Sequence, residues 1–208
     1  SLMLMNSRDK VLKSVFDLMI SKGDDELSVN DILKELNMTK GGFYHYFKSR
    51  DQLMTEIMNG FMLDMLINPL KFAVENDDGS LEVKDTLKMY FCLLPENYTG
   101  NDNEIYNMQN YFFLLFEMLG KYPQLRNRYK EYYIAHFNAV RQTILRGIAD
   151  KQLIKCADAY GCAEMMMSAR NGILALNIIY RNTDLQSRLE SSFETIWKEI
   201  TCRGEIDE

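Results

Sequence analysis

Residues 28–53 read SVNDILKELNMTKGGFYHYFKSRDQL, and their pattern decides the fold of the N-terminal part of the chain. Apolar residues recur every three to four positions, which predicts a helix that begins at Ser28. Ser28 can cap this helix, and Asp31 completes an acidic variant of the capping box. Asn37 tolerates the positive φ of a tight turn, and Thr39 can cap a second, very short helix. The stretch therefore predicts two helices joined by a short turn.

The rest of the chain also has helical periodicity and lacks the alternation that is typical of strands. A helix over about 7–21 precedes the quoted stretch, a fourth helix opens at Ser49, and breaks rich in Gly, Pro, Asn and Asp delimit five more. Pro69 lies inside the fourth pattern and is expected to kink or end it. The sequence thus predicts an all-α fold of about nine helices, with a three-helix head at 1–50 and a helical body at 51–208.

Charge is distributed unevenly between these two parts. Residues 1–50 hold eight Lys and Arg against seven Asp and Glu, a net charge of +1, which leaves −7 for the rest of a chain whose total is −6. Affinity for nucleic acid depends on where positive charge lies relative to the phosphates. A near-neutral head on an acidic body therefore permits nucleic-acid binding without arguing for it.

Several functional classes have little support. The four cysteines are irregularly spaced in a chain of 208 residues, which favours reduced thiols in a cytoplasmic protein. The apolar start SLMLM is too short for a signal peptide or a membrane span. The two histidines cannot form a three-histidine metal site, and no common catalytic or nucleotide-binding motif occurs. We therefore expect neither an enzyme nor a membrane partner, and no metal or cofactor.

Residues 39–53 resemble the end of the N-terminal head of the tetracycline-repressor (TetR) family of bacterial regulators. The family pattern there is like SKGxxYxHFxSKxxL, and this chain has TKGGFYHYFKSRDQL. The resemblance covers residues 8–57 with matched spacing. Two leucines stand where the family has small alanines, Asn37 replaces the turn glycine, and Tyr46 replaces a second histidine. The resemblance implies a transcriptional regulator, usually a repressor, that binds a palindromic operator as a homodimer and is released by a small-molecule effector.

In a helix-turn-helix protein the second helix enters the major groove of double-stranded DNA. The expected contacts to operator DNA are Ser28, Thr39, Lys40, Gly41, Gly42, Tyr44, His45, Lys48 and Arg50. Hydroxyls at helix starts, rings and flanking charges are expected to bind phosphates. Lys40 is the expected base reader, because lysine can donate to guanine O6 or N7, and the glycines allow the backbone to approach. Phe43 and Phe47 are assigned to the core of the head.

The last two helices, expected at about 158–181 and 184–202, carry continuous apolar stripes. The resemblance implies that they pair with their twins in a homodimer as a four-helix bundle. The alternative is that the same stripes form intramolecular core.

The body is rich in aromatic and methionine residues, which suits an adaptable pocket for a mostly apolar small-molecule effector. Such residues at helical spacing are more often plain core. The candidate ligand-binding residues are Tyr90, Gln109, Phe112, Phe113, Phe116, Tyr133, His136, Phe137, Met166 and Asn171.

Two other functions stay open at this point. One is a helical small-molecule sensor whose head does not bind DNA, against which Lys40, Tyr44 and Arg50 argue. The other is a DNA-bound interaction protein without transcriptional switching.

Overall fold

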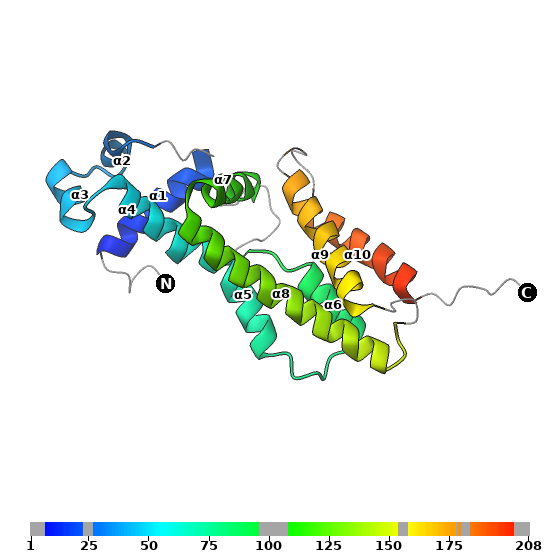
Figure 1. The fold of residues 1–208 in the computed structure, drawn as a ribbon. Helices are drawn as coiled ribbons and strands as arrows, with labels where there is room; N and C mark the ends of the chain where they lie inside the picture. Colours follow the sequence, from blue (N-terminus) through cyan, green and yellow to red (C-terminus); the bar gives the residue numbers. More distant parts are fainter. Residues whose placement is uncertain are drawn as a thin grey trace, which may run out of the picture. The chain divides into compact units, whose positions relative to one another are not determined.

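The computed structural model describes residues 7–22, 27–95, 108–153, 158–177, 179 and 184–201. Every regular element in these ranges is a helix (Figure 1). Nine helices are present in the described ranges when the continuous run over 50–75 is counted as one. The all-α prediction is confirmed.

The head contains four short helices whose starts are set by local capping. They are α1 (Ser7–Lys22), α2 (Val29–Glu35), α3 (Lys40–Tyr46) and α4 (Arg50–Ile57). Ser28 and Asp31 form the predicted capping box, and the side chains of Thr39 and Ser49 cap α3 and α4. Asn37 has a φ of 48°, as the tight turn requires.

The body begins with a long helical run and continues through five more helices. α4 passes into the π-helix η2 (Met58–Met62) and then into α5 (Leu63–Glu75). The others are α6 (Val83–Phe91), α7 (Met108–Lys121), α8 (Pro123–Ala149), α9 (Ala159–Leu176) and α10 (Leu185–Thr201).

Of the two effects expected of Pro69, a kink or an end of the helix, the end is ruled out, because α5 continues to Glu75. Proline removes one N–H from the helical ladder. The helix persists on both sides of it because α5 buries an apolar face that includes Leu66, Leu70 and Ala73.

The chain divides into two compact units. Unit 1 comprises Ser1–Met65 and Asn97–Tyr129, and unit 2 comprises Leu66–Glu96 and Lys130–Glu208. The boundaries between the units fall inside α5 and α8. The division into a DNA-binding head at 1–50 and a body at 51–208 therefore stays a prediction.

In unit 1, α1 packs on α4 and α7. Two polar contacts between these helices support the packing. Arg8 forms an ion pair with Glu56, and Asn110 donates a 2.7 Å hydrogen bond to the carbonyl oxygen of Ile20. Tyr111 donates to the carbonyl oxygen of Met62 in η2, at 2.7 Å. The head is therefore held on a helical base instead of standing alone.

In unit 2, α6, α9 and α10 pack on one another. The buried side chains of α10 include Leu189 and Phe193, and the Phe193 ring lies 5.8 Å from that of Phe91. Part of the apolar stripe that the sequence predicts for the last helix thus packs inside its own subunit. α9 ends at Leu176, earlier than the expected 181, and Asn177 caps it.

Candidate nucleic-acid interface and ligand-binding region

Aromatic side chains anchor one face of helix α3 in the core of the head. Phe43 and Phe47 are fully buried, as predicted, with ring centroids 5.6 Å apart. The guanidinium of Arg8 lies 4.9 Å from the centre of the Phe47 ring, a cation–π contact that joins α1 to the end of α3. This packing fixes which face of α3 points to solvent.

The opposite face of α3 is exposed, basic and aromatic. Lys40, Gly41, His45 and Lys48 are exposed, and Tyr44 keeps 49% of its surface accessible. In the described part of the chain neither lysine takes part in an ion pair, whereas Lys22 of α1 pairs with Glu35. This arrangement leaves positive charge and polar rings available for a polyanion.

The two glycines of α3 have different reasons to be there. A Cβ at Gly42 would lie 3.3 Å from Thr39 Oγ1, which accepts the Gly42 N–H at 3.1 Å, so the cap itself favours glycine at Gly42. A Cβ at Gly41 would meet nothing within 4 Å. Glycine costs about 1 kcal/mol in a helix relative to alanine, and the free protein offers no compensation at Gly41. Nothing in the described structure therefore requires glycine at position 41.

Ser28 and Arg50 differ from the other expected contacts because the fold already engages them. The Ser28 hydroxyl and the Ser28 backbone N–H both donate to the Asp31 carboxylate, and these two bonds lower the pKa of Asp31. The hydroxyl oxygen in turn accepts the Asp31 N–H. Arg50 is half-buried, and its Nε donates to the carbonyl oxygen of Leu27 at 2.7 Å. Arg50 therefore braces the start of α2 against α4, a role that sequence spacing did not indicate.

The candidate ligand residues are divided between the two units. Gln109, Phe112, Phe113 and Phe116 lie on α7 in unit 1, where Phe112 is buried but Phe113 and Phe116 are exposed. The remaining candidates lie in unit 2, and they are Tyr90, Tyr133, His136, Phe137, Met166 and Asn171.

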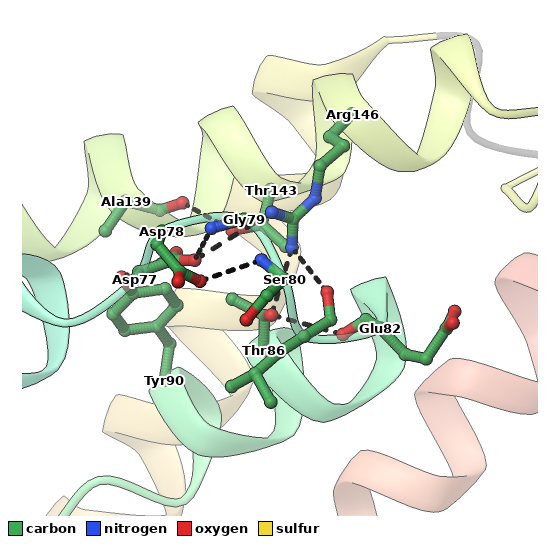
Figure 2. Close-up of polar contacts among 11 residues, drawn as sticks. Asp77, Asp78, Gly79, Ser80, Glu82, Thr86, Tyr90, Ala139, Thr143 and Arg146 are labelled. Atoms are coloured by element: carbon green, nitrogen blue, oxygen red, sulfur yellow. Dashed lines mark hydrogen bonds and ion pairs between the residues drawn. The ribbon is translucent and has the colours of Figure 1, made fainter.

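Unit 2 has an open cleft of about 530 Å³ where the loop 77–79 meets α8. Figure 2 shows Arg146 reaching across the loop, and its guanidinium donates to Thr86 Oγ1 at 3.0 Å. Tyr90 donates to Asp77 at 3.2 Å, and burial together with the Asp77 charge raises the pKa of Tyr90 to about 12. Four of the polar side chains in and beside the cleft thus bind one another in pairs, Tyr90 with Asp77 and Arg146 with Thr86.

His136 lies deeper in unit 2 and is fully buried. Its Nε2 lies 2.9 Å from the carbonyl oxygen of Tyr90, so Nε2–H donates and Nδ1 is left as the acceptor for the Tyr132 hydroxyl, 3.4 Å away. Burial and the nearby charge of Arg170 lower the pKa of His136 to about 3. The imidazole is neutral, and its two nitrogens are both used.

Sequence reasoning passed over Arg170, which lies beside His136 and next to the candidate Asn171. Its side chain is only 2% exposed. The signal was present in the sequence, because Arg170 falls on the same face of α9 as the buried Met166, Met167 and Leu174. A charged residue in the apolar stripe of a helix requires an explanation.

The expectation of reduced thiols fails at Cys162, which is disulfide-bonded, whereas Cys92 is free and half-buried. The described residues contain no group of three or more His, Cys, Asp and Glu side chains suited to a metal ion. Within the same ranges, each helix is too short or too polar to cross a membrane.

Comparisons with known proteins agree with this geometry. Residues 11–57 match the model of the family described as bacterial regulatory proteins, tetR family. The match contains α2, the turn, α3 and α4, which are the elements that present the basic face.

Two curated relatives are helix-turn-helix (HTH) transcriptional regulators. YvdT of Bacillus subtilis, itself called uncharacterized, is 29% identical over 79 residues, which are 38% of this chain and 40% of YvdT. QacR of Staphylococcus aureus is 24% identical over 134 residues, which are 62% of this chain and 68% of QacR. The chain thus aligns with less than half of YvdT and about two thirds of QacR.

The fold of the whole chain has solved counterparts. A TetR-family transcriptional regulator from Cytophaga hutchinsonii superposes with a TM-score of 0.67 at 18% identity, covering 95% of this chain and 96% of that one. An identity this low establishes the fold and nothing finer. The head thus matches the TetR family of bacterial regulatory proteins over residues 11–57, and the chain has the fold of solved proteins that are described as TetR-family regulators.

Proposed function

We propose that the protein is a cytoplasmic transcriptional regulator that binds a palindromic operator as a homodimer and is released by a small-molecule effector, most often acting as a repressor. The observation that carries the DNA-binding part is the exposed face of α3. It combines Lys40, the exposed Tyr44 and the unobstructed Gly41 on a helix whose other face is held by buried aromatic rings, and the exposed Lys48 follows just beyond the end of the helix.

Roles on DNA follow from the placement of each side chain. Lys40 lies at the start of α3 and is proposed to reach base edges, while Tyr44, His45 and Lys48 bind phosphates. Thr39 keeps its hydroxyl proton for a phosphate, because its oxygen is the acceptor in the cap. Ser28 and Arg50 serve mainly to position α2 and α3, since their polar atoms bind within the head.

Dimerisation is supported by apolar surface on α9 and on the segment just after it. Tyr160, Met165, Leu176 and Ile179 are exposed, with Ile179 at 71%, although their helix neighbours form core. Met165 and Leu176 share one face of α9, whereas Tyr160 lies on another face, where its ring contacts that of Phe137. Large apolar side chains that are exposed together are typical of a subunit interface. Two heads related by a two-fold axis would read half-sites about one DNA turn apart.

The effector is proposed to bind in unit 2, where His136 and Asn171 lie close to Arg170. A small molecule shifts the DNA-bound state only if it binds the DNA-free arrangement more tightly. The helical run over 50–75 begins in unit 1 and ends in unit 2, so it is one covalent route by which a change in unit 2 can alter the head.

The test compares Lys40→Ala with Lys48→Ala on a selected operator and on random duplex DNA. Lys40→Ala should lose about 1 to 3 kcal/mol of binding free energy mainly on the operator. Lys48→Ala should weaken binding to both DNAs and flatten the slope of log affinity against log salt by about one unit. Equal losses on both DNAs for both variants would contradict the division of roles. Binding unchanged in both would contradict the DNA face itself.

A further inference from the structure

Arg170 carries a buried positive charge that forms no ion pair with the residues that the structure describes. Its side chain is 2% exposed, and its Nε has no hydrogen-bond partner. Nη2 donates to the carbonyl oxygen of Leu93, and Nη1 donates to Asn171 Oδ1 at 3.3 Å. Both partners are neutral.

The other side chains around the guanidinium are neutral as well. Tyr132 hydrogen-bonds to Arg170 and to His136 Nδ1, and both residues are buried. His136 bears no charge, and its single ring N–H donates to the carbonyl oxygen of Tyr90. Every group that bonds to Arg170 is thus an uncharged oxygen.

No carboxylate of the described residues lies within ion-pair distance of Arg170. The acidic side chains of α10 have partners elsewhere: Glu190 accepts from Gln186 at 2.7 Å, and Glu194 pairs with Lys84 and Lys88. An arginine is almost never fully buried without an anion, because removing its charge from water costs several kcal/mol.

Nε–H is the donor of the Arg170 guanidinium that lacks a partner, whereas both Nη atoms already donate to protein oxygens. Nε–H and one Nη–H of arginine point in parallel and bind both oxygens of a carboxylate at once. The residues beside this edge on α9 and α8 are apolar or aromatic, including Met166, Met167 and Tyr132. The chemistry of this setting matches an apolar molecule that carries one anionic group.

We propose that Arg170 is the recognition residue for the carboxylate of an amphipathic organic anion, which is the effector class of this protein. The inference rests on the proposed function, which places an effector in unit 2, and it refines that effector from mostly apolar to apolar with one carboxylate. Tyr132, His136 and Asn171 act as positioning residues that hold the guanidinium.

The test measures binding to the full-length protein without DNA, by calorimetry and by the shift in melting temperature. The probes are decanoate and 4-phenylbutyrate, each compared with its alcohol, decanol or 4-phenylbutanol. The variants are Arg170→Met, which removes the charge at similar volume, and Arg170→Lys, which keeps the charge but loses the two-pronged edge. Arg141→Met is the matched control, because Arg141 also has an unpartnered Nε but is only half-buried.

We expect at least one carboxylate to bind and to raise the melting temperature, and its alcohol to bind far more weakly. Arg170→Met should weaken carboxylate binding by about 30-fold or more, and Arg170→Lys by about tenfold, while Arg141→Met should bind as the wild type does. Without ligand, Arg170→Met should be at least as stable as the wild type, because a buried unpaired charge has been removed.

Three results would overturn the inference: neither carboxylate binds, the alcohols bind as tightly as the acids, or Arg170→Lys binds as the wild type does. If Arg170→Met does not fold, the carboxylate affinity of Arg170→Lys still tests the inference. Because no DNA is present, the outcome is separate from the proposed function. Carboxylate binding through Arg170 with no effect on operator affinity would support the site and contradict the ligand switch.

Discussion

Replacing Gly41 by alanine should strengthen the fold and weaken DNA binding, a combination that a purely structural glycine does not produce. In the free protein a Cβ at Gly41 meets no atom within 4 Å, so the substitution causes no clash. Alanine is favoured over glycine in a helix by up to about 1 kcal/mol, and the free energy of unfolding should rise by up to that amount. On DNA the added methyl group would hold the backbone of α3 away from the bases.

The loss of affinity can be estimated from the contacts that would be displaced. Losing the base contact of Lys40 alone corresponds to a loss of about 1 to 3 kcal/mol in binding free energy, which raises the dissociation constant roughly 5- to 150-fold. Fluorescence anisotropy with a selected operator measures the affinity, and urea unfolding measures stability. Gly120→Ala is the control, because Gly120 is an exposed helical glycine of α7 whose Cβ would also meet nothing within 4 Å. Wild-type affinity in Gly41→Ala would refute the close approach of α3 to DNA.

Three further predictions concern stability. Arg50→Ala should lower the free energy of unfolding by about 1 to 2 kcal/mol, since it removes a charged hydrogen bond to a buried segment, and unchanged urea unfolding would contradict the bracing role. Because burial and the charge of Arg170 hold the pKa of His136 at about 3, the unfolded chain takes up this proton first. Stability should therefore fall as pH drops below about 6.5, by about 1.4 kcal/mol per pH unit, and His136→Gln should remove that slope. An identical pH slope in His136→Gln would contradict the neutral buried imidazole. Gly147→Ala should cost about 1 to 3 kcal/mol, because its Cβ would lie 2.8 Å from Leu153, and a wild-type melting temperature would show that this packing relaxes freely.

The head could be predicted from sequence because its determinants are local. The cap at Ser28, the positive φ at Asn37 and the cap at Thr39 each depend on residues within three or four positions. Helical periodicity placed Phe43 and Phe47 in the core for the same reason. Local rules of this kind need no knowledge of the tertiary packing.

Local rules did not suffice where a contact joins residues that are far apart in the chain, which happens in the body and also once in the head. Arg50 binds a carbonyl 23 residues away, and Arg170 binds one 77 residues away. The sequence gives residue types but not these contacts, so Arg50 was assigned to DNA and Arg170 was passed over. Helix ends in the body also depend on packing, which is why Pro69 does not end α5.

The central claim, that the exposed face of α3 reads DNA as part of a two-fold dimer, is tested most directly by selecting bound sequences from random duplex DNA with the full-length protein. We predict enrichment of a two-fold symmetric sequence whose half-sites are centred about 34 to 36 Å apart, or a multiple of that distance. The same selection with Lys40→Ala should lose its preference at the base pairs nearest that residue. No enrichment over the starting pool, or enrichment that Lys40→Ala leaves unchanged, would contradict the account.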